Sequence, residues 1–288
     1  MQADLGVASS LRSAVHAIGL RALGALAIGI AVVDAHAAPV VRQGSGASPA
    51  ALQALVDTFR ADLGGNNNGV GGSFADGRRE INWDGVPNAS ATPNFLTPDF
   101  FNTTSPRGVV FHTLLEDGGS AFNDFTVSAS TASGVPVRFG NINPAYASTF
   151  ITFSAERLFT PRAGHAMLVK FYQPGTTTPA VVKGFGAVFA DVDSANASVI
   201  SYYATDGSQL VAASAPVLNG GLSFVGVSFN AGEMIDHVVI RSGTHALSAS
   251  NNDGVSGVDV VALDDFIYGE PRPASGCLFE DGFDCQVP

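Results

Sequence analysis

The sequence predicts an all-β fold: an antiparallel, jelly-roll-like β-sandwich preceded by one N-terminal helix. From Arg78 onward, apolar residues alternate with polar ones in short runs rich in Val, Ile, Phe, Tyr and Thr. Gly, Asn, Asp and Pro separate these runs, and no later window sustains the apolar spacing of a helix. Many short strands without intervening helices favour two packed antiparallel sheets over a parallel α/β sheet.

The first 37 residues are typical of an export signal. Two arginines precede an unbroken small and apolar run, Ala22–Val33, and Ala35-His36-Ala37 then places small residues at a cleavage site before Ala38. The run of 12 residues is shorter than the roughly 20 that a membrane-spanning helix needs, which favours a cleavable signal over an anchor. We therefore expect a secreted protein, located outside the cell, in the periplasm or at the cell surface.

One helix is expected in the next region, residues 38–73. Ser48 suits the N-cap, Pro49 suits the first helical position, and Gly64-Gly65 ends the run. The apolar residues in between recur at helical spacing: Leu52, Leu55, Val56, Phe59 and Leu63. This stripe requires a surface to lie against, and we expect it to pack on a face or edge of the sheet. The stretch Asn66–Gly72 is then a Gly/Asn-rich connector.

The β-sandwich domain is expected over residues 74–269. Its predicted strands are Arg78–Trp83, Gly108–Leu114, Phe125–Ser130, Ser148–Phe153, Ala166–Gln173, Phe185–Val192, Val199–Ala204, Gln209–Ala213, Leu222–Phe229, Ile235–Arg241 and Val258–Tyr268. No proline-rich linker interrupts them, and two half-sandwiches would have poor cores, so we expect a single domain.

Residues 270–288 are predicted to form a linker and a C-terminal tail. Cys277 and Cys285 lie close together in this tail, with no histidine nearby to complete a zinc site. In an oxidising compartment, the spacing favours a disulfide that closes a short loop.

Charge and composition narrow the function classes. The formal net charge is −11, with 25 acidic against 14 basic residues, which disfavours nucleic acid and anionic membrane surfaces as partners. A hydrophobic fraction of 46%, a charged fraction of 14% and 20 phenylalanines indicate a globular domain with a large core rather than a disordered chain.

Aspartates gather in two places that suggest a metal ion. Asp191 and Asp193 stand at the end of one predicted strand, on one side of the chain, and Asp264 and Asp265 lie in the last strand beside Leu263 and Phe266. A buried carboxylate requires compensation, and calcium accepts several hard oxygens in irregular geometry. The sequence therefore predicts structural Ca²⁺ held by Asp264 and Asp265, shared with Asp191, Asp193 or Glu80. The alternative is that Asp264 or Asp265 caps a strand end or pairs with Arg78, Arg79 or Arg241.

Aromatic residues suggest a carbohydrate ligand. Sugar rings stack on exposed aromatic faces beside a few polar groups, and the candidates for this role are Trp83, Tyr146 and Tyr202. The alternative is that Trp83 belongs to the core, as a single tryptophan near a strand end more often does.

The segment Val261–Gly269 (VALDDFIYG) resembles the final strand of jelly-roll domains of the galactose-binding and carbohydrate-binding-module kind. In those domains an aspartate of the last strand often belongs to a structural calcium site, which the resemblance implies for Asp264. The stretches Gly77–Pro87 and Phe139–Tyr146 resemble uncharacterised secreted bacterial β-sandwich proteins, and Leu278–Asp284 is similar to short tails of secreted proteins in some Gram-negative bacteria.

Local signatures of common enzymes are missing from the sequence. It contains no Gly-x-Ser-x-Gly, His-Glu-x-x-His or P-loop motif. We therefore expect an exported, non-enzymatic β-sandwich that binds carbohydrate or another cell-surface polymer, with structural calcium. Two alternatives stay open: a secreted hydrolase of the glycosidase or esterase type, whose residues converge from distant positions, and a purely structural surface or matrix protein.

Overall fold

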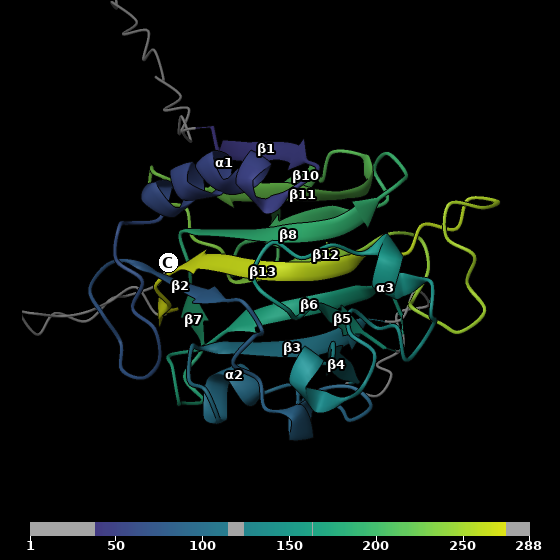
Figure 1. Cartoon of the computed structure of the whole chain (residues 1–288). Helices are drawn as coiled ribbons and strands as arrows, with labels where there is room; N and C mark the ends of the chain where they lie inside the picture. The colour runs from purple at the N-terminus through teal and green to yellow at the C-terminus, as the bar shows by residue number, and fades with distance from the viewer. Residues whose placement is uncertain (1–37, 115–123, 163, 275–288) are drawn as a thin grey trace, which may run out of the picture. The chain divides into compact units, whose positions relative to one another are not determined.

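Two antiparallel sheets packed face to face form the body of the protein in a computed structural model, which describes residues 38–114, 124–162 and 164–274 (Figure 1). This confirms the predicted all-β sandwich. The predicted export signal and the cysteine pair, Cys277 and Cys285, lie outside the described residues.

The first sheet has seven strands within the described residues. In spatial order they are β1 (Val40–Gly46), β11 (Leu218–Ser228), β8 (Gly184–Val192), β13 (Ala262–Gly269), β5 (Phe159–Pro161) and β4 (Phe125–Val127), with β2 (Arg78–Ile81) also paired to β13.

The second sheet has five strands in the same part of the chain. Their order is β10 (Gln209–Ser214), β9 (Val199–Tyr203), β12 (His237–Arg241), β6 (Ala166–Phe171) and β3 (Val109–Leu114). A small ladder joins β7 (Ala180–Val181) to β14 (Arg272–Pro273). The two sheets enclose the main core, in which Phe111, Phe159 and Phe266 contact one another around Trp83.

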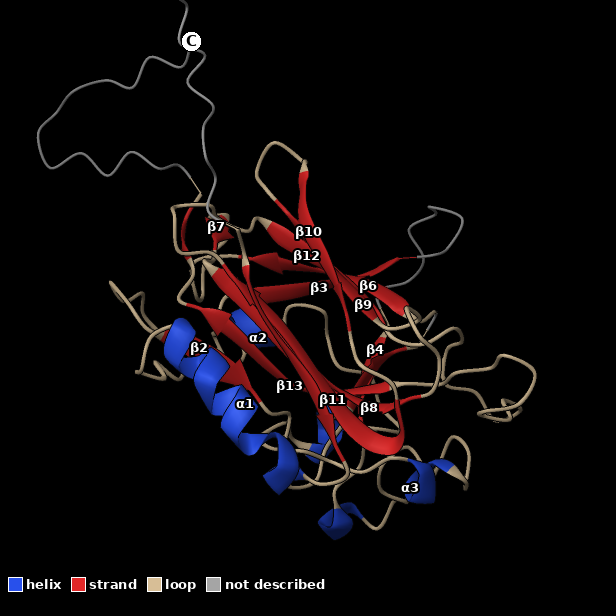
Figure 2. Cartoon of the chain, turned by 90° about the horizontal axis from the view of Figure 1, so that it is seen from above, coloured by secondary structure: helices blue, strands red, loops and turns tan. Residues whose placement is uncertain are grey.

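The longest helix of the described residues, α1 (Pro49–Asp62), covers the outer face of the seven-stranded sheet, as Figure 2 shows beside β11 and β13. This agrees with the predicted helix and with the expectation that its apolar stripe lies on the sheet. Leu52, Val56 and Phe59 are buried there. The strands beneath carry Gly186 and Gly226, which pair with each other and leave room for the Phe59 ring.

The predicted strand Ser148–Phe153 is wrong. The short helix α3 (Tyr146–Thr149) occupies its beginning, and coil follows. Tyr146 and Phe150 lie four residues apart and are both buried in the cluster beneath α1, so this stretch follows a helical rather than an alternating spacing. The other short helical segments are α2 (Phe100–Thr103) and two 3₁₀ turns, Asn88–Ser90 and Thr131–Ser133.

The sandwich extends past both predicted boundaries. At the N-terminal side, β1 pairs with β11 over its whole length, although that segment was expected only to carry the helix and connector. At the C-terminal side, Glu270 is buried and forms an ion pair with the buried Arg79 at 2.7 Å. The same guanidinium donates to the carbonyls of Gly69 and Gly72, so it ties the connector to the sheet. No helix among the described residues combines the length and apolar character needed to cross a membrane.

Candidate metal site at the strand ends

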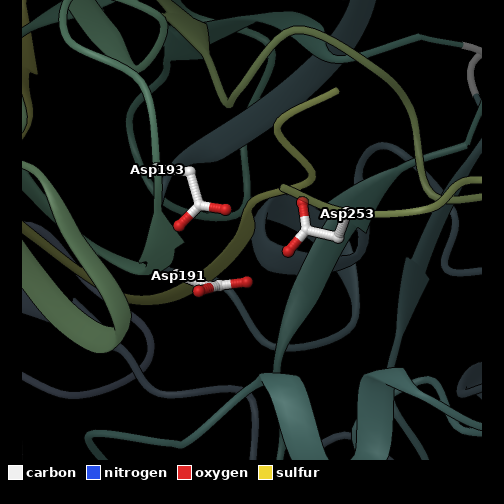
Figure 3. A group of neighbouring side chains, drawn as sticks. All are labelled: Asp191, Asp193 and Asp253. Atoms are coloured by element: carbon white, nitrogen blue, oxygen red, sulfur yellow. The ribbon is translucent and has the colours of Figure 1, made fainter. Parts of the chain in front are cut away.

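Three aspartates meet where β8 ends. Asp191 belongs to β8, Asp193 follows it directly, and Asp253 comes from the long loop between β12 and β13. One carboxylate oxygen of each residue lies within 4.8 Å of the corresponding oxygens of the other two. Figure 3 shows the three carboxylates grouped around a common space. This spacing suits a single metal ion that binds all three residues.

Asp191 is held in an unusual conformation. Its φ is 69°, in the left-handed region that aspartate tolerates better than most residues. Opposite Asp191 the pairing of β11 shifts: Leu218 pairs with Val192 and Leu222 with Ala190, so three residues of β11 face one residue of β8. The bulge brings the backbone N–H of Gly220 to Asp191 Oδ1 at 2.5 Å. Gly220 has a φ of 64°, which glycine adopts readily.

Backbone hydrogen bonds hold the other two carboxylates in place. Asp253 Oδ1 accepts the backbone N–H of Val260 at 2.8 Å, which folds the loop back onto the start of β13. Asp259 accepts the backbone N–H groups of Asp193 and Ser194 at 3.3 and 2.9 Å, which fixes the turn after β8. Asp259 thus positions Asp193 without joining the cluster.

Several carboxylate oxygens of the cluster are buried without a partner. Asp191 is only 1% exposed, and its Oδ2 has no hydrogen-bond donor at normal geometry; the same holds for both oxygens of Asp193. No ion pair between a basic residue and any of the three aspartates occurs among the described residues. Native proteins rarely bury such atoms uncompensated, because each loses its hydration without gaining a donor.

The electrostatics of the cluster follow from this burial. Burial raises the pKa of Asp191 to about 8, and its contact with Asp253 raises that pKa as well, while the Gly220 N–H acts in the opposite direction. Burial also raises the pKa of Asp193, with a further contribution from repulsion by Asp253 and a lowering by the Asn219 amide. Without a cation, the carboxylates oppose one another's ionisation. A divalent cation would reverse the sign of these interactions.

A pocket of about 420 Å³ adjoins the cluster. Asp191 and Asp253 belong to its lining. The remaining lining is mostly amide, hydroxyl and backbone groups from three segments, namely Asn143, Ala145, Tyr146, Ser148, Thr149, Asn219, Gly220, Asn251 and Asn252.

The other predicted metal ligands form a separate group. In β13 the register shifts so that Asp264 and Asp265 together oppose a single position of β8, between Leu263 and Phe266. Asp264 is fully buried, and its oxygens accept the Phe153 N–H at 2.6 Å and the Ser154 hydroxyl at 3.0 Å. These donors satisfy Asp264 without an ion.

Arginines compensate the neighbours of Asp264. Glu80 pairs with Arg60 of α1 at 2.7 Å and with Arg78 at 2.6 Å, and Arg60 lies 3.7 Å from Asp265. Among the described residues, Asp264, Asp265 and Glu80 do not form a group close enough to share an ion. The prediction that Asp264 shares calcium with Asp191, Asp193 or Glu80 is corrected accordingly. The arginines named in the alternative have other partners among the described residues, because Arg78 pairs with Glu80 and Arg79 with Glu270. Arg60 lies near Asp265 instead, while Asp265 Oδ1 is buried without a hydrogen-bond partner.

The aromatic platform predicted from the sequence is also corrected. Trp83, Tyr146 and Tyr202 are at most 1% exposed. Trp83 stacks on Phe159 at 4.0 Å, and its indole N–H donates to the Asp264 carbonyl. A ring enclosed by other side chains has no free face on which a sugar could stack.

The two tyrosines are anchored by their hydroxyl groups. Tyr146 donates to the Ser248 carbonyl at 2.9 Å, and Tyr202 donates to the Phe185 carbonyl at 3.0 Å. Alternation along β9 turns Tyr202 inward and Tyr203 outward, where Tyr203 stacks on His237. Tyr146 nevertheless lines the pocket beside the aspartates.

Sequence reasoning missed Asp253. It lies in Asn251-Asn252-Asp253-Gly254, a turn sequence rich in oxygen ligands that precedes the last strand. This composition was the available signal, but only the folded loop brings it to the end of β8. In comparisons with known proteins, no family model, curated protein or solved structure matched the chain.

Proposed function

We propose that this chain is an exported, non-enzymatic β-sandwich that binds carbohydrate or another cell-surface polymer, and that Ca²⁺ bound by Asp191, Asp193 and Asp253 holds its strand ends together. The observation that carries the proposal is the convergence of three carboxylates, of which Asp191 and Asp193 have buried oxygens without hydrogen-bond partners.

The donor set selects calcium among the common metal ions. All three side chains offer hard carboxylate oxygens, and the cluster contains neither the histidine nor the cysteine that zinc prefers. The carboxylates come from a bulged strand end, a turn and a loop, and calcium tolerates such irregular geometry better than magnesium, which demands a near-ideal octahedron.

Calcium at this position would stabilise the native topology. Asp191 and Asp193 belong to the end of β8, Asp253 to the loop before β13, and Gly220 connects β11 to the same point. An ion that binds only the folded arrangement stabilises it by about 2.7 kcal/mol at a free concentration of 100 times Kd. For a domain of this size, that corresponds to a rise in Tm of about 5–10 °C.

Thermal unfolding of the mature protein tests the proposal. We expect Tm to fall when EDTA replaces 5 mM Ca²⁺, and we expect Mg²⁺ to restore little of the loss. The Asp253→Asn variant should show no calcium response. Asp206→Asn is the matched control, because Asp206 lies in an exposed hairpin turn and bonds only to Ser208 in the described structure. Equal Tm values in calcium and in EDTA for the wild type would refute the ion site.

Burial of Trp83 favours a second candidate, the purely structural surface protein without a small ligand. The polar pocket beside the aspartates supports a ligand instead. A glycan array probed with and without chelator separates the two, since a structural protein would respond to calcium in unfolding and bind no glycan.

A further inference from the structure

We infer that the calcium ion also contacts the ligand directly, by coordinating two adjacent hydroxyl groups of a neutral sugar seated in the pocket beside Asp191 and Asp253. This inference rests on the calcium site proposed above and assigns the ligand class of that same site.

The first argument is the number of oxygens that the chain provides. Asp191 and Asp253 each use one carboxylate oxygen to accept a backbone N–H. This leaves Asp191 Oδ2 and both oxygens of Asp193, which are buried without a hydrogen-bond partner, and the second carboxylate oxygen of Asp253 as ligands for an ion. Calcium takes about six to eight oxygens, so at least two coordination positions remain for water or for a ligand.

The second argument is direction. Asp191 and Asp253 line the pocket, whereas Asp193 does not. The remaining coordination positions therefore face the pocket rather than the interior of the sandwich. Its volume of about 420 Å³ lies within the range of about 300–1,000 Å³ that small-molecule sites occupy.

The third argument is charge. Among the described residues, the pocket lining includes two of the three aspartates and no lysine or arginine. Three carboxylates and one Ca²⁺ leave this end of the sandwich with a net negative charge, so a phosphate or carboxylate ligand would be repelled. A neutral ligand with hard oxygens avoids this repulsion, and adjacent sugar hydroxyls supply two such oxygens at once.

The fourth argument is the remaining lining of the pocket. Asn252 and Asn219 are exposed, and the Asn252 amide can both donate to and accept from a hydroxyl group, whereas the Asn219 amide also interacts with Asp193. Coordination and hydrogen bonding would thus replace aromatic stacking, which the buried positions of Trp83 and Tyr202 do not permit.

Binding of neutral polysaccharides tests the inference. Immobilised mannan, galactan and β-glucan serve as probes, each also after periodate oxidation and borohydride reduction, which destroys adjacent hydroxyl pairs. A polyuronate serves as the anionic comparison. We expect at least one untreated neutral probe to bind in 5 mM Ca²⁺, and we expect that binding to be lost in EDTA and after periodate treatment.

Two variants separate this inference from the calcium site. Asn252→Ala should retain the calcium-dependent rise in Tm and lose about tenfold in glycan affinity, the effect of one well-placed hydrogen bond. Asn252 accepts the Val255 N–H through its backbone carbonyl, so the loop is preserved in this variant. Asn230→Ala, at an exposed asparagine outside the pocket, is the control and should match the wild type in both measurements.

The outcomes are distinct. If calcium raises Tm but no neutral probe binds, the ligand inference fails and the ion site is retained. The same conclusion follows if glycan binding persists in EDTA or after periodate treatment. It also follows if the protein binds the polyuronate more tightly than the neutral probes, or if Asn252→Ala leaves the glycan affinity unchanged. If calcium does not change Tm, the proposed function itself fails.

Discussion

Phe59 of α1 lies directly over Gly226 of β11. A Cβ atom on Gly226 would fall 2.8–2.9 Å from three atoms of the Phe59 ring, and one on the paired Gly186 would fall 2.8 Å from a fourth. The two glycines thus leave an area without side chains on the outer face of the sheet, and the Phe59 ring of the helix packs against this area. Without it, α1 could not approach the sheet closely enough to bury its apolar stripe.

The first prediction concerns this contact. Gly226→Ala should lower the free energy of unfolding by about 1–3 kcal/mol, because the added methyl group overpacks a filled interface. Gly65→Ala is the control, since a Cβ there meets no atom within 4 Å. Combining Gly226→Ala with Phe59→Leu should cost less than the sum of the single substitutions in urea denaturation. Strict additivity would show that the ring and the glycine do not interact.

A second prediction concerns the charge of the aspartate cluster. Asp193→Asn removes one of three mutually repelling carboxylates, so we expect its Tm in EDTA to equal or exceed that of the wild type. In 5 mM Ca²⁺ the variant should have a lower Tm than the wild type, because it lacks an ion ligand. Calorimetry in the two buffers measures both orders. A variant that melts lower than the wild type in EDTA would mean that Asp193 stabilises the fold without an ion.

The third prediction is a pH dependence at Asp264. Burial raises the pKa of Asp264 well above its ordinary value of 3.8, and repulsion from Asp265 raises it as well, whereas hydrogen bonds from Phe153 and Ser154 oppose the shift. The charged groups that face this pair are Glu80 and, from α1, Arg60, with Arg78 behind Glu80. The folded state therefore retains a proton that the unfolded chain releases above about pH 4. Stability from this group falls as the pH rises from 3.8 toward the raised pKa.

The comparison of variants isolates this effect. In urea denaturation, Asp264→Asn should gain stability relative to the wild type as the pH is raised from about 4 to about 7. For Asp206, hydrogen bonds from Ser208 lower the pKa, so ionised Asp206 stabilises the fold above pH 3.8 and this contribution is lost as the pH falls. The difference between the wild type and Asp206→Asn should accordingly stay nearly constant over this range, because the Asp206 contribution is lost only at lower pH. A stability difference between wild type and Asp264→Asn that is flat with pH would contradict the buried, protonated state.

The fourth prediction addresses the buried ion pair of Arg79 and Glu270. Glu270→Ala leaves the fully buried guanidinium without its carboxylate and should cost about 3–5 kcal/mol of unfolding free energy. Asp62→Ala breaks the more exposed pair with Arg42 and should cost at most about 1 kcal/mol. Chains shortened after Gly269 should be destabilised like Glu270→Ala, whereas chains ending after Ala274 should retain the pair. Equal stability of the two shortened chains would place the domain boundary at Gly269 after all.

The fifth prediction concerns export. Intact-mass analysis of the exported protein should find a chain that begins at or near Ala38. Such a cut leaves β1 whole, since that strand starts at Val40 and pairs with β11 along its length. A mature product that retains Leu20–Val33 would identify the segment as an anchor.

Local pattern was sufficient for much of the fold. The helix predicted over Ser48–Leu63 agrees with α1 because its proline and its 3.6-residue spacing lie within one short stretch, although Ser48 at the N-cap makes no side-chain hydrogen bond. Most of the predicted strands coincide with observed ones for the same reason, since alternation is a property of neighbouring residues. The prediction of a strand over Ser148–Phe153 was wrong because Tyr146 and Phe150, one helical turn apart, are both buried. Their helical spacing decides the structure of this stretch, rather than the alternation that follows them.

The candidate site depended on tertiary structure instead. The sequence by itself determined that Asp191 and Asp193 stand at a strand end and that aspartates of the last strand need compensation. Only the fold decided which of them meet: a bulge in β11 brings Gly220 to Asp191, and the loop after β12 brings Asp253 beside it, whereas a bulge in β13 directs Asp264 to Phe153 and Ser154. The physical reason is that compensation of a buried charge depends on which donors or ligands lie within about 3 Å of it, and those partners come from segments far apart in the chain.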